Sequence, residues 1–415
     1  MRFSVLPAQL SPIAIDVGAS TIKMLQITTG EAPRIHALAE IEVPEPIRGD
    51  HEKRFEFMRQ EIPAAVRGHG FKGRRVVCAP TSTQVLVQSI QVDRVSDAPE
   101  LAAAQLEAQL ECQPGSLVVR AAEITKGNRD GRAHTEMLCW AMAREDSMRY
   151  VEMFNSVRCR LVGIHPQVRS VVSAFDHLNR RLADADICTM YVDLGWGGMK
   201  VAVAHGTDMV FAKQVQIGGR QFDGLVSESN ACDMVTARIR RVEEGISFDR
   251  APFPAARERT APTGGIAMIR SGTPRLHGGD PGGSVVTDVA MERRKGVTPA
   301  EFANHVPPGP DRVLAAGVDC SEIVESMSDE LSMCARYHGS LFGGRRIDRV
   351  VFLGGEARST LLCRRLAESL NVPAQLGDPI ARFADGPDDP RLPEPGRSAP
   401  GWASACGLCT SPVDF

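Results

Sequence analysis

Short runs of apolar residues bounded by turn residues occur in two similar stretches of the chain. The first begins at residue 13, has a further apolar stretch that follows residue 23 and reaches residue 27, turns at Thr29-Gly30 and resumes over residues 35–43. The second begins at residue 190, turns at His205-Gly206-Thr207 and resumes over residues 209–217. Runs of this length between turn residues are typical of strands. The pattern therefore predicts two related β-meanders, one in each of two domains.

Both meanders open with the same motif. Residues 13–23 and residues 190–200 each contain Asp-x-Gly-x4-Lys, and the two copies keep a constant offset. Turn residues explain each copy separately, but agreement in register is the signature of an internal duplication.

A third motif lies near the carboxyl end. The apolar run Arg349–Leu353 leads into Gly354-Gly355, and apolar residues then recur at helical spacing between Ser359 and Leu370. The pattern predicts a strand, a tight turn, a helix and a short strand over residues 374–376. A Gly-Gly pair after a strand allows a flat base or ribose to lie against the backbone.

The paired turns suit phosphate binding. Glycine removes the Cβ, so that backbone N–H groups can surround an oxyanion, and Ser20 or Thr21 adds a hydroxyl. An aspartate at a strand end offers an oxygen to Mg²⁺, directly or through water. Lys23 can reach phosphate as a point charge. The alternative is that each turn is an Asp-Gly hairpin without a ligand.

Between the two meanders the pattern predicts a small α/β subdomain. Strands are expected over residues 85–92, 117–124 and 135–143, and amphipathic helices over residues 98–111 and 146–157.

Residues 251–310 contain nine prolines and nine glycines and show no sustained period. This composition predicts a flexible, exposed insertion between the helices expected over residues 234–244 and 321–338. The alternative is a segment that folds when it binds a partner.

Composition narrows the function classes. The chain has 415 residues, 43% of them hydrophobic, and a formal net charge of −3. A disulfide miniprotein, a fibre and a disordered chain are excluded, and nucleic acid is not expected as a partner because no basic stripe is present. No apolar run approaches the roughly 20 residues that cross a bilayer, and the first ten residues do not resemble a signal peptide.

The 11 cysteines are scattered along the chain, which favours a reducing cytoplasm. Cys406 and Cys409 have the spacing of half a zinc site, but no second pair follows, so apolar packing is the favoured interpretation.

The three motifs, in this order, resemble those of the actin/Hsp70/sugar-kinase superfamily. Within it the chain is similar to the PilM group, the actin-like cytoplasmic proteins of type IV pilus assembly. The segments that carry the resemblance are Ile15–Lys23, Ala79–Ser82, the helix Glu100–Glu111, Ile217–Phe222, Ile347–Gly355 and Ala403–Leu408.

The resemblance implies an α/β fold with duplicated actin-like, ribonuclease-H-like domains on either side of a nucleotide cleft. The first domain would comprise residues 11–85 and 166–188, and the second residues 189–245 and 311–413. A peptide-binding subdomain would be inserted over residues 86–165, and residues 246–310 would form the flexible insertion.

The resemblance also implies ATP and Mg²⁺ as ligands. Asp16 and Asp193 would bind the metal through water. The phosphate contacts would come from Gly18, Ala19, Ser20, Thr21 and Lys23 on one side and Gly195, Trp196, Gly197 and Gly198 on the other. Gly354, Gly355 and Glu356 would meet the nucleoside.

Two departures from the family bear on hydrolysis. Trp196 stands where active relatives usually carry a small hydroxyl residue, and Gln167 stands near the position where the PilM group tends to have Glu. An amide can orient water but cannot take its proton, so the expectation is at most a slow ATPase. For Gln167 the alternative is a polar residue at a helix start that faces solvent.

The expected function is an ATP-binding scaffold of type IV pilus assembly or a related secretion system. Its partner would be the N-terminal cytoplasmic peptide of a bitopic, PilN-like inner-membrane protein, which would hold the scaffold at the membrane without insertion. A small-molecule kinase is the alternative enzyme, but no catalytic Asp motif is found between residues 87 and 177. An FtsA-like filament former is the other alternative; residues 407–415 carry no cation to bind a membrane directly, and self-association stays open.

Overall fold

The computed structural model describes residues 9–93, 96–129, 132–179, 181, 184–245, 318–384, 386 and 388–411. The predicted Pro/Gly-rich insertion lies outside the described residues. All the described residues belong to one of the two units into which the chain divides.

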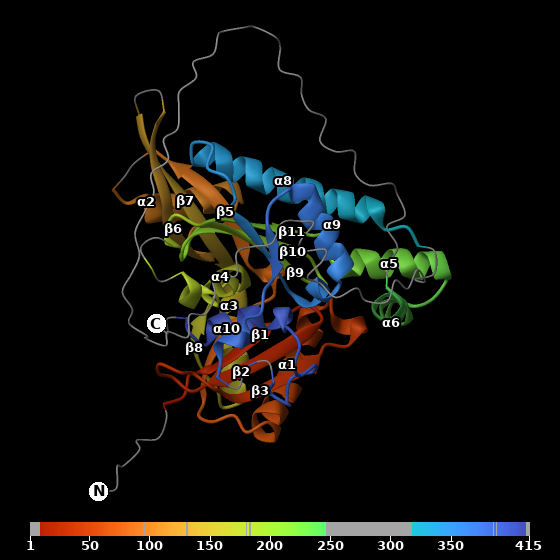
Figure 1. Ribbon diagram of the computed structural model, residues 1–415. Coiled ribbons are helices and arrows are strands. Elements are labelled where there is room, and N and C mark those ends of the chain that lie inside the picture. The colour runs from red at the N-terminus through yellow and green to blue at the C-terminus, as the bar shows by residue number, and fades with distance from the viewer. Residues whose placement is uncertain are drawn as a thin grey trace, which may run out of the picture. The chain divides into compact units, whose positions relative to one another are not determined.

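The first large sheet has the strand order β3-β2-β1-β4-β8 (Figure 1). Its strands are β1 (Ile13–Val17), β2 (Thr21–Ile27), β3 (Ile35–Glu42), β4 (Arg75–Ala79) and β8 (Arg160–Ile164). β1, β2 and β3 form an antiparallel meander, while β4 and β8 continue the sheet in parallel from β1.

Alternate side chains of β1 enter different cores, because successive residues of a strand point to opposite faces. Ile13 and Ile15 pack with Phe55 of α1 (His51–Gly68) and Phe154 of α3 (Arg144–Ser156). Ala14 faces the core that contains α4 (Gln167–Ser173) and α10 (Ala403–Leu408).

The second large sheet repeats the same plan, with the order β11-β10-β9-β12-β13. Its strands are β9 (Cys188–Leu194), β10 (Met199–His205), β11 (Asp208–Val215), β12 (Arg349–Leu353) and β13 (Ala374–Leu376). One face is covered by α5 (Gly219–Asn230), α6 (Met234–Glu244), α8 (Ser321–Leu341) and α9 (Thr360–Leu370), which supply Phe222, Ala237, Leu331 and Leu366 to the core.

The opposite face of the second sheet shares a core with the first sheet. Tyr191 and Ala202 of the second sheet belong to the same buried cluster as Ala14, Val171 of α4 and Cys406 of α10. The two duplicated halves are therefore joined by apolar packing around α4 and α10.

A third, smaller sheet has the order β5-β7-β6 and is antiparallel. It consists of β5 (Leu86–Val92), β6 (Leu117–Arg129) and β7 (Arg132–Ala143), and α2 (Ala98–Gln109) packs on it through Ala102 and Leu106. Short 3-10 turns complete the described chain at Glu45–Ile47, Ser82–Gln84, Asp176–Leu178, Gly355–Arg358, Ile380–Arg382 and Pro400–Trp402.

The predicted elements are confirmed with shifts at their ends, and the strand expected over residues 117–124 continues to Arg129. Both meanders are present, and the helix expected over residues 98–111 stops at Gln109 because Glu111 has a positive φ of 53°. The helix expected over residues 321–338 continues to Leu341. The boundaries of the domains stay a prediction.

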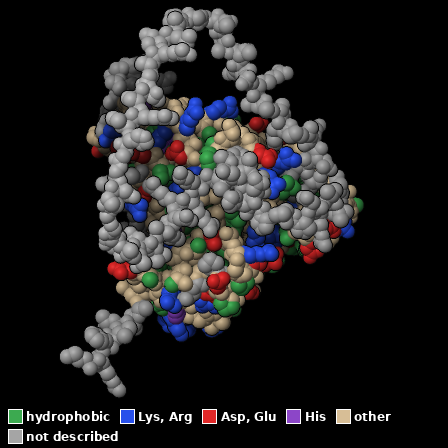
Figure 2. Space-filling model, in the orientation of Figure 1, with side chains coloured by type: hydrophobic (Ala, Val, Ile, Leu, Met, Phe, Trp, Pro, Cys, Tyr) green, Lys and Arg blue, Asp and Glu red, His purple; other side chains and the backbone are tan. Residues whose placement is uncertain are grey.

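No helix in the described ranges is both long and apolar enough to cross a membrane. Figure 2 shows acidic and basic side chains interspersed on one face, in keeping with the small net charge.

Candidate functional site

The two Asp-x-Gly turns lie against each other. The β1–β2 turn contains Gly18, Ala19 and Ser20, and the β9–β10 turn contains residues 195–198. A Cβ added to Gly197 would lie 2.9 Å from the Cβ of Ala19, closer than carbon atoms can pack. Glycine at position 197 thus allows the duplicated turns to come into direct contact.

A chain of polar side chains crosses from one hairpin to the other. Asp16 Oδ1 accepts a hydrogen bond of 2.7 Å from Gln167 Nε2, and Gln167 Oε1 accepts one of 3.2 Å from Lys200 Nζ. Lys200 Nζ also lies 2.9 Å from Asp193 Oδ2. Asp16, Gln167 and Asp193 are all buried. We refer to Asp16, Gln167, Lys200 and Asp193 as the polar chain.

Burial makes the charge on Asp16 costly. It raises the pKa of the Asp16 carboxyl above its ordinary value, and outweighs the opposing effects of Lys23, Lys200 and the Gln167 hydrogen bond. A carboxylate in such a place is stabilised by additional positive charge.

The hairpin register explains the spacing of the motif. Asp16 lies opposite Lys23 across β1 and β2, and Asp193 lies opposite Lys200 across β9 and β10. The side chains nevertheless differ. Lys200 pairs with its own aspartate, whereas Lys23 donates to Thr21 Oγ1 at 2.8 Å and lies 3.7 Å from Glu40.

The first turn is held by an arginine that the sequence motifs do not include. Arg54 of α1 is buried and donates to the carbonyls of Gly18 (2.8 Å) and Ala19 (2.9 Å). The N–H groups of Ala19 and Ser20 donate to no oxygen of another described residue. Free N–H groups at a turn are suited to an anion. The available sequence signal was a cation beside Phe55 on the apolar face of a helix.

In the second turn the Trp196 ring contacts α5 and Arg48. Its Nε1 donates to Asp223 Oδ2 of α5 at 2.6 Å, and the Arg48 guanidinium lies 4.6 Å from the ring centre. Gly198 is needed for a structural reason, since a Cβ there would lie 2.6 Å from the carbonyl oxygen of Val215.

The Gly-Gly motif adjoins the end of β9. Gly354 has a φ of +90°, and a Cβ there would collide with the carbonyl oxygen of Leu194 and with Asp193 Oδ1. The next residues form a 3-10 turn, and Glu356 gives both carboxylate oxygens to Arg241 at 2.6 and 3.2 Å. Arg241 also donates to Asp223 at 2.6 Å.

This ion-pair network shows what Glu356 does in the fold. The network links α6, α5 and the turn after β12, and it is almost fully buried. Because the carboxylate is committed to Arg241, a nucleoside would have to meet the backbone here rather than the Glu356 side chain.

The residues fit a magnesium-bound phosphate group. Asp16 and Asp193 offer oxygens for Mg²⁺ or its waters, the N–H groups of Ala19 and Ser20 offer anion contacts, and Lys23 is near enough to Thr21 to add positive charge. Lys200 already neutralises Asp193, so Asp16 is the carboxylate more in need of a cation.

The Cys406/Cys409 pair packs in the core. Burial raises the pKa of both thiols, and each side chain belongs to the cluster around α4 and α10. All 11 cysteines lie in the described ranges, and none forms a disulfide.

No family model matches the chain, and no curated protein matches it. Among solved structures, the PilM-PilN type IV pilus biogenesis complex is similar over 97% of this chain and 98% of that chain, with a TM-score of 0.66 and 15% identity. The ethanolamine utilization protein EutJ from Carboxydothermus hydrogenoformans is similar over 97% and 90% of the two chains, with a TM-score of 0.45 and 12% identity. That second likeness is too distant to support an inference.

The repeated strand order and the full-length likeness define the class: the chain has the actin-like ATPase fold, with two ribonuclease-H-like sheets and an additional antiparallel subdomain. Within that class it resembles PilM, which confirms, at the level of fold, the resemblance predicted from the sequence motifs.

Proposed function

We propose that this chain is an ATP-binding scaffold of type IV pilus or related secretion assembly, located in the cytoplasm and held at the inner membrane by a partner's cytoplasmic tail. The proposal has two parts, nucleotide binding (the nucleotide half) and partner binding (the partner half). The buried polar chain between the duplicated turns is the observation that carries the nucleotide half. The full-length likeness to the PilM-PilN complex supports the partner half.

In this proposal Asp16 and Asp193 hold Mg²⁺ through water, and the first turn binds the terminal phosphates. The backbone of residues 195–198 forms the opposing contact, and Gly354 and Gly355 meet the nucleoside. The turns and the metal would neutralise the negative charge of the ATP phosphates.

The proposal assigns little catalytic power to Gln167. Both ends of its amide are engaged, the nitrogen with Asp16 and the oxygen with Lys200. An amide also cannot accept a proton from water at neutral pH. Nucleotide binding would therefore serve mainly as a structural or switching signal, with slow hydrolysis at most.

The partner tail would bind the small sheet and α2. A shallow hollow of about 430 Å³ lies there, lined by Val92, Asp93, Leu101, Ala104 and Gln105. Leu101 is 36% exposed and lines the hollow together with buried Val92. These two side chains give the hollow an apolar surface, and Asp93 and Gln105 add polar groups to its lining. An apolar side chain of the tail would fill it.

The nucleotide half is tested by calorimetry with Mg-ATP on the full chain and on Asp16→Ala, with phosphate release followed in the same samples. We expect binding by the natural chain, loss in the variant and negligible release. Asp186→Ala, at an exposed position, is the control. Absence of binding by the natural chain would overturn the nucleotide half, and rapid release would favour an ATPase or kinase.

The partner half is tested separately with a synthetic N-terminal peptide of a PilN-type protein. Binding to the natural chain should be weakened at least tenfold by Leu101→Glu and unchanged by Leu178→Glu, which alters another exposed leucine, 45% exposed against 36% for Leu101. A peptide that bound both variants equally, or not at all to the natural chain, would contradict this assignment.

A further inference from the structure

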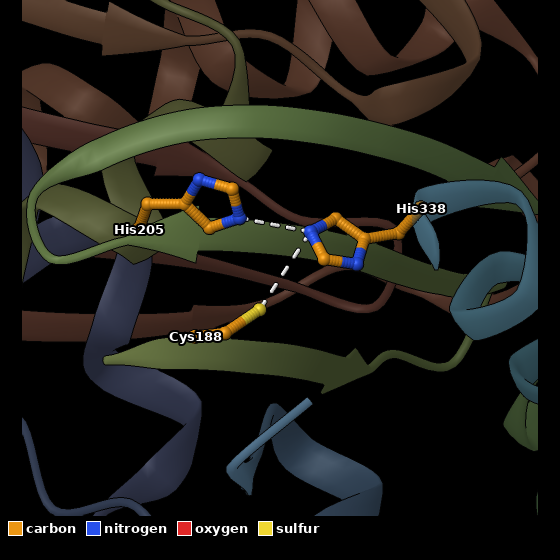
Figure 3. A group of neighbouring side chains, drawn as sticks. All are labelled: Cys188, His205 and His338. Carbon is orange, nitrogen blue, oxygen red and sulfur yellow. Dashed lines mark hydrogen bonds between the residues drawn. The ribbon is translucent and has the colours of Figure 1, made fainter. Parts of the chain in front are cut away.

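Three metal-ligating side chains meet at the end of the β9–β10 hairpin away from the Asp-x-Gly turn. Cys188 begins β9, His205 ends β10, and the two residues lie opposite each other in the strand register. His338 comes from α8. Figure 3 shows the three side chains pointing toward one another.

The ligand atoms are spaced as a metal requires. His205 Nε2 lies 2.9 Å from His338 Nε2, Cys188 Sγ lies 3.7 Å from His338 Nε2, and all three atoms are within 4.8 Å of one another. Around a tetrahedral zinc the corresponding separations are about 3.3 Å between nitrogens and about 3.5 Å between sulfur and nitrogen. The two separations that involve His338 Nε2 therefore need shifts of only a few tenths of an ångström to match a tetrahedral ion.

The surroundings suit such an ion. Cys188 and His338 are fully buried, while His205 is partly exposed and leaves a path from solvent. The Phe342 ring packs at 4.7 Å from the His205 ring centre and 4.9 Å from that of His338, and shields both. Arg345 repels a cation here, whereas Asp208 and Asp348 attract one.

Ligation requires particular proton positions on the three groups. Each imidazole offers the lone pair of its Nε2 to a metal when the ring proton sits on Nδ1. Burial raises the pKa of the Cys188 thiol to about 12, so the metal itself must displace the thiol proton.

We infer that Cys188, His205 and His338 form a zinc site, with water as the fourth ligand. A thiolate and two imidazoles favour a borderline-soft divalent ion over Mg²⁺ or Ca²⁺. On binding, the Cys188 thiol gives its proton to solvent and forms the sulfur–zinc bond. The histidines shift their remaining proton to Nδ1, so one proton is released for each zinc bound.

The site would fasten α8 to the second sheet. Its strand ligands lie at the opposite end of the hairpin from Asp193 and Lys200, so metal binding here is separate from the proposed Mg-ATP contacts.

The test uses the full chain stripped of metal by a chelator and titrated with Co²⁺ and then Zn²⁺. We expect one equivalent of Co²⁺, with visible bands of tetrahedral cobalt and a thiolate-to-cobalt band in the ultraviolet, all removed by Zn²⁺. Cys188→Ser should remove the thiolate band and lower the affinity at least tenfold. Calorimetry in buffers of different ionisation enthalpy should report one proton released per zinc.

Cys232→Ser, which changes a partly exposed cysteine elsewhere, is the matched control and should bind as the natural chain does. Because Cys188 is buried, His205→Gln provides a second variant at a partly exposed position, again with at least a tenfold loss expected. A thiolate band that persists in Cys188→Ser, bands lost in Cys232→Ser, or no tetrahedral cobalt in the natural chain would each overturn the assignment.

Discussion

At the scale of single residues, Asp16 shows a conflict between stability and binding. Its carboxylate is buried and is neutralised only partly, by an amide and by lysines that have other partners. A group that must be charged to bind a cation is costly while no cation compensates it. Sites of this kind commonly reduce the stability of the fold that carries them.

Asp16→Asn should therefore raise the midpoint of thermal unfolding of the metal-free protein, by roughly 2–4 °C at pH 8, while Mg-ATP binding is lost. The folded pKa of Asp16 is raised, so the wild-type protein loses stability as pH rises from the unfolded pKa of 3.8 through the folded value. The advantage of the variant should shrink toward pH 4. Differential scanning calorimetry across this range measures it.

The control for that experiment is Asp186→Asn, which removes an exposed carboxylate and should leave the midpoint unchanged. An equal rise in both variants would mean that net charge, rather than burial of Asp16, controls the effect.

Gly354 needs glycine for its backbone conformation, with a ψ of 170° beside its positive φ, and also for its close steric contacts. Its φ of +90° is almost the same as the +87° of Gly344, but a Cβ at Gly344 meets nothing within 4 Å, whereas one at Gly354 strikes the Leu194 carbonyl. Gly344→Ala should cost about 1–2 kcal/mol from the left-handed backbone alone.

Gly354→Ala should cost at least about 1–3 kcal/mol more, because the collision is with backbone and cannot be relieved by a side-chain rotation. Urea denaturation of both variants gives the difference. Equal losses would show that the end of β9 moves freely away from the Gly-Gly turn.

At the scale of elements, α10 is unusual because a six-residue helix is buried along its whole length. It lies against α4, and Gly407 approaches so closely that a Cβ would strike the Ser170 carbonyl. This contact sets the distance between two short helices that both belong to the shared core.

Gly407→Ala should destabilise the protein by about 1–3 kcal/mol. The matched variant is Gly339→Ala in α8, where the nearest atom to the added carbon is 3.7 Å away. There the better helix propensity of alanine should stabilise by up to about 1 kcal/mol. The denaturation midpoint should fall in Gly407→Ala and rise in Gly339→Ala. A decrease of similar size in both variants would contradict the packing argument.

At the scale of the whole molecule, the shared core couples the duplicated halves. Buried residues from both large sheets, from α4 and from α10 form one cluster, and the polar chain adds hydrogen bonds between the same halves. Neither half retains a complete core if the other unfolds.

We therefore expect the two halves to unfold in one transition. Thermal melts followed by far-ultraviolet and near-ultraviolet circular dichroism should coincide, and the calorimetric and van't Hoff enthalpies should agree. Val171→Ala, in the shared core, should shift both probes together. Two separated transitions would show that the halves are thermodynamically independent.

Local sequence patterns were sufficient to predict the meanders and the helices, because the periodicity of a strand or a helix can be read from residues that are neighbours in the sequence. The position of Asp16 opposite Lys23 in the strand register follows from the hairpin itself. By contrast, Arg54 on the first turn and Arg241 on Glu356 depend on residues brought from distant elements. The grouping of Cys188, His205 and His338 is likewise invisible in sequence, since one ligand comes from a helix far along the chain.

The two motif lysines have different partners, so the duplicated turns are not equivalent in charge. A strictly two-fold arrangement would offer an elongated anion two equivalent ways to lie between them. Here one ammonium is bound to the aspartate of its own hairpin and to Gln167, while the other is turned toward Thr21 and Glu40. The two hairpins keep the same backbone plan but differ in the placement of positive charge, so the two orientations that an elongated anion could take between the turns would differ in energy.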